Sequence, residues 1–282
     1  MFTLRIDNHK GQVFELTHNT ANYVVAKIDG LTRPPTSINT ATAGTIDGAF
    51  FNSARMEMRN LVITLILRGD IEANRQYLYQ LFPHRSLCTI YFKNTNRDVK
   101  IDGYVETLEA DLFVIQEAVQ ISIKCPRPFW EDLNLLYAEL STIVGSFEFP
   151  FTISTPIPFS EVYDSPHAII NNHGDTETGM SLTAVISSAV TSITITNETT
   201  GESFAVAYSF QADDVLHICT VQNQLAVTVL RDSTTTNLLN YVQRGSKWIK
   251  LTAGRNVLTY SVEGGDADFD IEITALQLYG GV

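Results

Sequence analysis

Apolar and polar positions in the first half of the chain follow the pattern of a β-rich domain with one helix. Residues 61–68 (LVITLILR) form an apolar run rich in β-branched side chains, which is typical of a buried strand. A glycine and Asp70 end this run, and apolar residues then recur on one helical face. Because Asp70 can cap a helix and Pro83 cannot continue one, the sequence predicts an amphipathic helix over residues 70–82.

The remainder of the first half predicts further strands. Residues 87–93 and 99–110 flank the polar turn NTNR and predict a β-hairpin, and residues 113–124 predict another long strand. Proline cannot donate to a β-ladder or continue a helix, so the two prolines of CPRPFW are expected to end regular structure. The first domain is therefore expected to span residues 1–130.

The second half has a different pattern, with short runs rich in Thr, Val and Ile between polar turns. A connector is expected over residues 131–158, with a possible helical turn at 131–140, and a second domain over 159–282. Eight strands without intervening helices indicate an antiparallel jelly roll or a related β-sandwich. The predicted strands are 179–186, 191–196, 203–209, 215–220, 225–230, 248–251, 256–262 and 269–278.

Composition and charge support a folded protein with two unlike halves. The chain has 282 residues, of which 44% are hydrophobic and 18% charged, which argues against disorder. The net charge is −12, and it is uneven: residues 1–140 carry 14 basic and 16 acidic side chains, whereas residues 141–282 carry 5 and 15. Because an acidic surface repels phosphate, we expect no sequence-independent binding of nucleic acid by the second half. We also expect no sequence-specific nucleic acid as a partner.

Cysteines and the N-terminal sequence bear on where the protein is made. Cys88, Cys125 and Cys219 are odd in number and far apart, which supports neither a disulfide framework nor a zinc site. The N-terminus lacks the features of a signal peptide, and no segment has the roughly 20 apolar residues of a membrane span. We expect synthesis in a reducing cytoplasm and no membrane partner.

Acidic clusters and histidines are the candidates for a metal site. The segment DADFDIE (266–272) would place four carboxylates on one face of a strand, which allows a calcium site or, as we favour, an ordinary solvated edge. His167 and His173 lie close in sequence without a third ligand. We therefore predict no metal site.

Catalytic motifs give no better candidates. Asp213 and Asp214 lie where a turn enters a strand, and a structural role is favoured there over a catalytic one. The sequence has no G-x-S-x-G nucleophile motif and no glycine-rich phosphate loop. The sequence predicts no catalytic residues, no cofactor and no enzyme activity.

Sugar binding is an alternative, because an exposed aromatic ring on a β-sandwich can stack against a pyranose. Trp248 and Tyr260 are the carbohydrate candidates, and Tyr241 is a third available ring. Packing within the sandwich is the favoured interpretation of these aromatic residues. The alternative function is therefore a carbohydrate-binding adhesion module for host cell-surface glycan.

Several motifs in a fixed order resemble one protein family. These motifs are GAFFNSARMEMRNLVITLILRGD, an R-x-x-x-x-x-G-Y-V hairpin, a Cys-Pro-x-Pro-Phe segment, NNHGDTETG, NETTGE, GSKWIKLTAGRNVLTY and a terminal LQLYGG. Together they span nearly the whole chain. They resemble the distal tail proteins of siphophages, the baseplate hub family called Dit.

The resemblance implies a fold, an assembly and a location. The fold would be a split-barrel-like ring domain with one helix, followed by a galectin-like jelly roll. The assembly would be a homo-oligomer, expected to be a hexameric ring, that joins the tail tube to tail-tip or receptor-binding proteins in the virion. The Thr-rich segment 31–46 would be a loop or an arm that spans to a neighbouring protomer.

Three charged residues of the first motif are candidates for the ring interface. Arg55, Glu57 and Arg59 would share one face if the motif were a continuous strand, because side chains alternate along a strand. An ion-pair network between protomers is the functional interpretation, and a solvated strand face is the favoured alternative.

Overall fold

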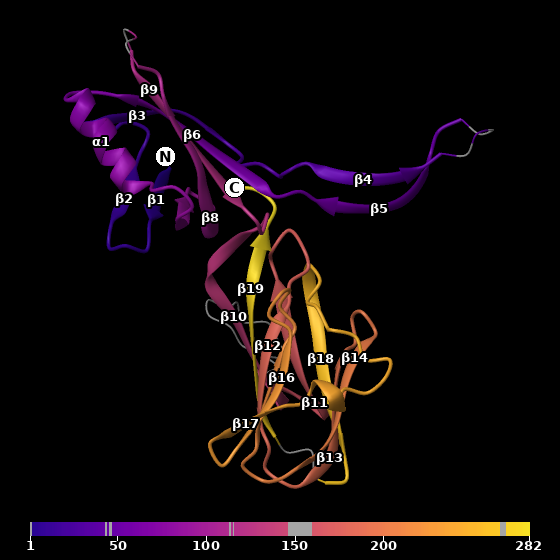
Figure 1. Cartoon of the computed structure of the whole chain (residues 1–282). Coiled ribbons are helices and arrows are strands. Elements are labelled where there is room, and N and C mark those ends of the chain that lie inside the picture. The colour runs from indigo at the N-terminus through magenta and orange to yellow at the C-terminus, as the bar shows by residue number, and fades with distance from the viewer. Residues whose placement is uncertain are drawn as a thin grey trace, which may run out of the picture. The chain divides into compact units, whose positions relative to one another are not determined.

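The fold was analysed in a computed structural model that describes residues 2–42, 44, 47–112, 114, 116–145, 160–265 and 269–282. The chain divides into two compact units, and each has its own hydrophobic core. Unit 1 comprises Met1–Leu133 and Leu278–Val282, and unit 2 comprises Asn134–Gln277. Both units consist mainly of antiparallel strands (Figure 1). The predicted mainly β fold is therefore confirmed.

Unit 1 is built on an antiparallel sheet in the order β2-β1-β7-β8-β9-β6-β3, and the start of β10 pairs with β8. Along β6 the side chains alternate between buried and partly exposed, as expected for a strand with one face on the core. The strands are β1 (Thr3–Asp7), β2 (Val13–Leu16), β3 (Tyr23–Asp29), β6 (Arg59–Leu67), β7 (Leu87–Lys93), β8 (Asp98–Ala110), β9 (Ala118–Cys125) and β10 (Trp130–Gly145).

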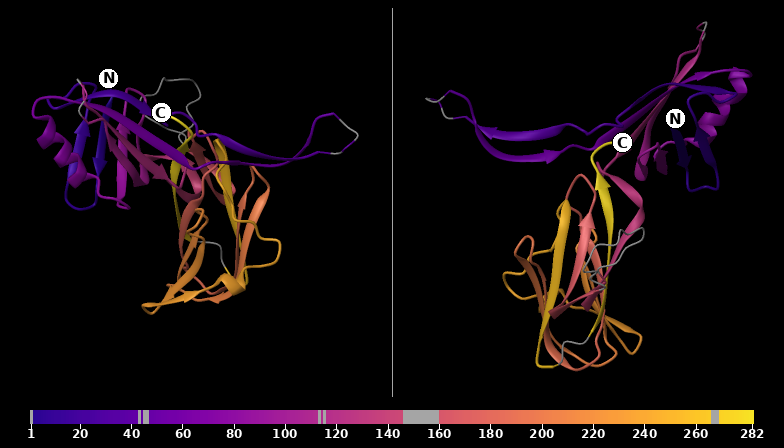
Figure 2. Two further views of the ribbon diagram at one scale, coloured as in Figure 1. Left: turned by 45° about the horizontal axis from the view of Figure 1, so that its top comes forward. Right: turned by 180° about the vertical axis from the view of Figure 1, so that it is seen from behind.

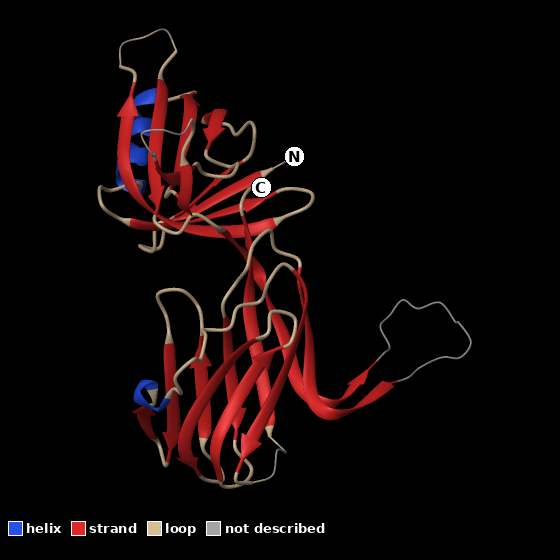
Figure 3. Cartoon of the chain, turned by 90° about the vertical axis from the view of Figure 1, so that its right-hand side faces the viewer, coloured by secondary structure: helices blue, strands red, loops and turns tan. Residues whose placement is uncertain are grey.

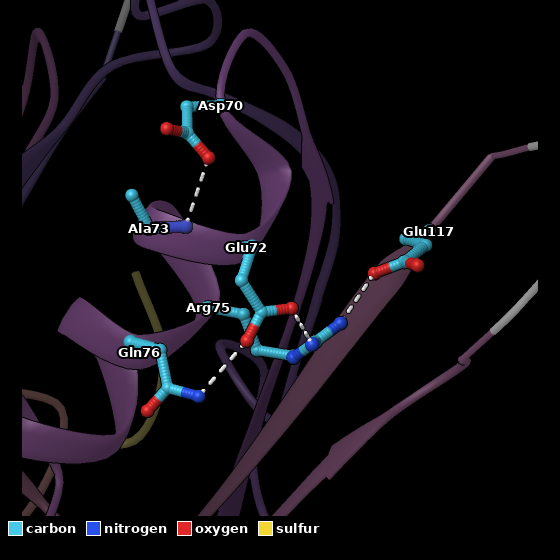
Figure 4. Close-up of polar contacts among 6 residues, drawn as sticks. All are labelled: Asp70, Glu72, Ala73, Arg75, Gln76 and Glu117. Atoms are coloured by element: carbon cyan, nitrogen blue, oxygen red, sulfur yellow. Dashed lines mark hydrogen bonds and ion pairs between the residues drawn. The ribbon is translucent and has the colours of Figure 1, made fainter.

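The predicted helix is present as α1 (Ile71–Leu81), and it is the only α-helix in the described part of the chain. The short second blue segment in Figure 3 is a 3₁₀ turn. The carboxylate of Asp70 accepts a hydrogen bond from the amide of Ala73 at 3.1 Å and so caps the first turn, as Figure 4 shows. Arg75 joins the helix to the sheet, because it donates to Glu117 just before β9 at 2.8 Å. The helix face that enters the core of unit 1 contributes Asn74, Leu78 and Leu81.

A second, two-stranded sheet also belongs to unit 1. Strands β4 (Thr36–Ala41) and β5 (Phe50–Met56) pair with each other and with no other described strand. Side chains along both strands are exposed, except that Met56 is half-buried. Figure 2 shows this hairpin, which we call the arm, projecting from the sheet of unit 1.

Unit 2 is a sandwich of two antiparallel sheets. One sheet has the order β10-β11-β18-β13-β14 and the other β19-β12-β15-β16-β17, with β10 also pairing with β19. Alternate side chains of both sheets fill the core between them. The strands are β11 (Ser160–Asn172), β12 (Met180–Val185), β13 (Val190–Asn197), β14 (Glu202–Phe210), β15 (Val215–Cys219), β16 (Ala226–Arg231), β17 (Thr234–Asn237), β18 (Gly254–Glu263) and β19 (Asp270–Tyr279), with a 3₁₀ turn η1 (Leu239–Tyr241).

Three sequence predictions about secondary structure need correction. The possible helical turn at 131–140 is wrong, because these residues belong to β10. Residues 248–251 form no strand, and only Leu251 makes an isolated bridge, to Thr178. The strand predicted from residue 113 begins later, at Ala118.

The helical turn was predicted wrongly because apolar content alone does not fix backbone pairing. Along β10, Leu135 and Tyr137 face outward while Leu136 and Leu140 pack on the core, so both faces are apolar and the period of two is hidden.

No helix among the described residues is long and apolar enough to cross a bilayer.

Candidate assembly surfaces

The arm exposes large apolar side chains that its own chain does not cover. Ile38 and Phe51 are 61% and 67% exposed, and Phe50 is also exposed. Ile38 lies opposite Ala54 in the register of the hairpin, so apolar groups of the two strands lie side by side. An isolated two-stranded hairpin is only marginally stable in water, and unpaired strand edges favour association. The arm is therefore a surface suited to contact with another protein chain.

The root of the arm is a network of backbone contacts around one buried arginine. The amide of Glu57 donates to the carbonyl of Pro35 at 2.9 Å and joins the two strands where the arm meets the rest of unit 1. Arg59, the first residue of β6, is 1% exposed. Its guanidinium donates to the carbonyls of Gly30 and Thr32 at the entry to the arm.

The same guanidinium reaches two further segments of unit 1. Arg59 donates from Nε to the carbonyl of Pro128 at 2.8 Å and from Nη2 to that of Gly280 at 2.7 Å. It also lies over the ring of Trp130, at 5.4 Å from the ring centroid. Burial lowers the pKa of Arg59 to about 10, so the group stays charged at neutral pH. Carbonyl oxygens thus compensate this buried charge.

The expected common face of Arg55, Glu57 and Arg59 is wrong. Arg55 lies in β5 and is exposed, whereas Arg59 begins β6 and is buried, because the chain leaves the arm between these two residues. Glu57 lies between the strands and is half-buried. The buried guanidinium of Arg59 directs its hydrogen bonds to carbonyls of its own unit. An interface role therefore remains a hypothesis for Arg55 and Glu57.

The β8–β9 hairpin offers a second exposed apolar surface on unit 1. Leu112 and Val114, beyond the end of β8, are 44% and 51% exposed. The ion pair between Arg75 and Glu117 fixes the start of β9 to helix α1, next to this loop, and both side chains are largely buried there. The apolar loop therefore adjoins a strand end that is fixed to the helix.

The carbohydrate candidates occupy unequal positions in the sandwich. Tyr260 is only 5% exposed, stacks on Phe269 and accepts a hydrogen bond from that residue's amide, so it offers no ring face to a sugar. Trp248 is half-buried, with its ring centroid 4.8 Å from that of Phe204. Tyr241 is exposed and meets Tyr208 edge-on. The favoured packing interpretation fits the first two rings.

The candidate carboxylates lie in structural positions. Asp270 and Glu272 are exposed while Phe269 and Ile271 are buried, as a solvated strand edge requires; positions 266 and 268 lie outside the described residues. No group of three or more metal-ligating side chains occurs in the part of the chain that the structure describes.

Asp214 forms the most deeply buried ion pair of the sandwich among the residues described. Its carboxylate is fully buried and accepts from Nε of Arg231 at 2.7 Å and from the amide of Gln211 at 2.9 Å. The hydrogen bond from Arg231 holds the pKa of Asp214 below its usual range. This pair connects β16 to the turn before β15, which is a structural role.

The cysteines lie inside the cores as free thiols. Burial raises the pKa of Cys88 and of Cys125 to about 12. Both are therefore protonated at neutral pH, and a thiol is a far weaker nucleophile than a thiolate.

The apolar side chains of the arm are the functional candidates that sequence reasoning missed. Phe50, Phe51 and Ile38 lie in or next to segments noted for other features, namely the family motif and a Thr-rich stretch. A partial signal was present, because the segment from Gly30 to Gly48 carries Thr and Asn between glycines and leads into two adjacent phenylalanines. Nothing in that pattern tells an exposed hairpin from a strand of the core.

Comparisons with known proteins agree with this architecture. Residues 173–274 match the family SPP1_Dit, described as the C-terminal domain of the siphovirus-type tail component. No curated protein sequence matches the chain. Among solved structures, the Dit protein (gp 19.1) of phage SPP1, described as a paradigm of hub adsorption apparatus in phages infecting Gram-positive bacteria, superposes with a TM-score of 0.70. The match is 15% identical and covers 99% of both chains.

A second structural match is weaker. A chain of the phage p2 baseplate in its activated conformation gives a TM-score of 0.47 at 10% identity, covering 97% of this chain and 98% of the other. The matches to SPP1_Dit and to the SPP1 protein confirm the resemblance to distal tail proteins that the sequence motifs indicate. Residues 173–274 of the sandwich thus match the model of a C-terminal domain of siphovirus-type tail components, and the whole chain has a fold similar to that of the SPP1 protein.

Proposed function

We propose that this protein is a structural subunit of a siphophage tail tip, a distal tail hub that assembles into a ring. The observation that carries this proposal is the arm, whose apolar side chains are exposed along a hairpin paired only with itself among the described strands. A single copy leaves this surface in water, whereas a neighbouring copy would cover it. The likeness to a phage hub protein in fold supports the same assignment.

The proposed mechanism is geometric and includes no chemical step. The arm of one copy lies on unit 1 of the next, and such a head-to-tail contact generates a closed ring when the rotation between copies divides a full turn. We propose six copies. Arg55 and Glu57, which both lie near the root of the arm, would then contact the neighbouring copy.

The two units would have separate tasks in the virion. Unit 1 would form the ring that continues the tail tube and leaves a channel for DNA. The sandwich, which matches the tail component family, would carry tail-tip or receptor-binding proteins. Its acidic composition suits a surface that does not retain DNA.

Electron microscopy and light scattering of the purified chain test this proposal. We expect a mass close to six times 31.4 kDa and six-fold rings with a central opening. Solitary molecules at every concentration up to the solubility limit would contradict it. A ring of another copy number would correct the stoichiometry and leave the hub assignment in place.

The carbohydrate-binding alternative has less support. Of the rings considered, Tyr260 is buried and Trp248 packs on Phe204, which leaves only Tyr241 exposed. Titration with host cell-wall polysaccharide, followed by tryptophan fluorescence or a glycan array, separates the two functions. A saturable response would favour the adhesion module, and we expect none.

A further inference from the structure

The last residues of the chain pack against the root of the arm. The amide of Val282 donates to the carbonyl of Leu31 at 3.1 Å, and the carbonyl of Gly280 accepts from Arg59. At Gly280 the backbone lies so close to Arg33 that an added Cβ would be 2.9 Å from Nε of that side chain. Figure 1 shows the C-terminus beside the place where β6 and the arm meet.

Tyr279 anchors these last residues in unit 1. Its side chain is buried in the core, and its hydroxyl donates to the carboxylate of Asp132 at 2.9 Å. Arg97 lies over the tyrosine ring at 3.8 Å from the centroid. The segment from Leu278 onward is therefore held independently of its contacts with the arm.

Arg59 links the contacts of the C-terminal segment to those of the arm root. One guanidinium binds the carbonyls of Gly30 and Thr32, at the entry to the arm, together with that of Gly280 from the C-terminal segment. These are charge-assisted hydrogen bonds in a buried site, which are stronger than neutral ones. If the C-terminal acceptor is removed, the buried cation loses compensation and its hold on the arm weakens.

We propose that residues Leu278–Val282 form a clasp that fixes the root of the arm through Arg59, so that the arm keeps the direction a neighbouring copy must meet. The role in assembly rests on the proposed ring, whereas the effect on the arm root does not. Without the clasp, Arg59 keeps its bonds to Gly30 and Thr32 but loses its bond to the carbonyl of Gly280. The root then opens more often.

Hydrogen exchange measured by mass spectrometry on the full-length protein and on two variants tests the clasp. One variant lacks Gly280–Val282, and the milder one lacks only Val282, which removes its bond to Leu31 and its packing on the core of unit 1 but keeps the acceptor at Gly280. We expect amides in residues 30–42 and 50–57 to exchange about tenfold faster in the first variant and less so in the second. Arg244→Lys, an exposed change in unit 2, is the matched control and should leave exchange unchanged.

The outcomes separate the clasp from the ring. If the wild type forms rings and the variants show a faster root and fewer rings by light scattering, both proposals stand. If the wild type is monomeric but the root still exchanges faster in the variants, the ring fails and the clasp stands. Unchanged root exchange in the variants overturns the clasp. Exchange that rises equally in the root and in β7 and β8 of the larger deletion would mean a general loosening of unit 1 and would also overturn the clasp.

Discussion

Two charged side chains in the interior show how this protein uses buried charge. Arg59 is compensated by backbone carbonyls from several segments, and Asp214 by the guanidinium of Arg231 and one amide. In each case the charged group connects segments that are distant in sequence. Neither group is placed to react with a substrate, because its hydrogen bonds are directed to its own chain. Buried charge here determines loop positions.

The pair between Asp214 and Arg231 predicts a specific pH dependence of stability. The pKa of Asp214 is lower in the folded chain than in the unfolded chain, so its contribution is present at pH above about 4 and is lost as the pH falls through the folded value. We expect Asp214→Asn to lower the free energy of unfolding by about 2 kcal/mol at pH 7. The difference from the wild type should shrink as the pH is lowered toward 3. Urea unfolding at several pH values measures it.

The neighbouring carboxylate provides the control for this prediction. Asp213 is exposed and has a positive φ of 68°, a conformation that asparagine also tolerates. Asp213→Asn should leave both the stability and its pH dependence nearly unchanged. A difference between Asp214→Asn and the wild type that stays constant from pH 7 to pH 3 would contradict the assignment.

Gly103, the glycine of the R-x-x-x-x-x-G-Y-V motif, lies where two strands are in close contact. On β8, an added Cβ at this position would lie 2.6 Å from Cγ2 of Ile123 and 2.9 Å from Sγ of Cys125. The close contact between β8 and β9 therefore leaves room only for glycine. The sequence showed a glycine in a hairpin motif but not which strand lies against it.

At the level of elements, the arm is the part of the protein whose purpose its own contacts do not explain. The pairing of β4 with β5 holds the arm together, and its root is fixed in unit 1. Beyond that root the described side chains of the arm are exposed. Substitutions there should affect association without affecting the fold.

The double substitution Ile38→Asp and Phe51→Asp tests whether the arm makes the contact between copies. Both side chains are more than half exposed, so the change should shift the melting temperature by less than about 2 °C. Two carboxylates buried at the contact with a neighbouring copy would cost several kcal/mol, so we expect the ring to dissociate into monomers. Light scattering and thermal unfolding measure the two effects.

Leu225→Asp is the control for the arm substitutions. Leu225 is an exposed apolar residue of the sandwich, and it should tolerate the same charge with the ring intact. Rings that persist in the arm variant, or that are lost equally in Leu225→Asp, would show that the arm is not the contact.

Elements with a clear period or clear capping residues were predictable from the sequence. The helix after Asp70 and the strand β7 are present where the pattern places them, because local signals fix both. The strand β10 was missed because both its faces are apolar. Residues 248–251 look like a strand, yet side chains hold this segment: Asn197 and Asn172 donate to the carbonyls of Lys250 and Leu251. Such long-range contacts leave no local signal.

The candidate site was less predictable than the fold, for a related reason. Arg55 and Arg59 are four positions apart, but the end of β5 and the start of β6 lie between them. The burial of Arg59 depends on carbonyls from residues as distant as Gly280. Spacing within one segment cannot reveal acceptors that only the tertiary fold brings together.

For the whole molecule, the two hydrophobic cores allow the two proposed tasks to be separated. The core of unit 1 includes Leu65, and the core of unit 2 includes Phe204. Each core should respond separately to a change in packing, since the members of one cluster do not pack in the other. If unit 1 alone makes the ring, a destabilising substitution in the sandwich should leave the ring intact.

Phe204→Ala and Leu65→Ala form a matched pair for this prediction. Each removes a buried side chain, and each should cost its own unit about 3 kcal/mol. We expect Phe204→Ala to lower the sandwich transition in differential scanning calorimetry while light scattering at 20 °C still shows rings. Leu65→Ala should instead weaken the rings, because β6 begins at the arm root. Equal loss of rings in both variants would mean that the sandwich takes part in assembly.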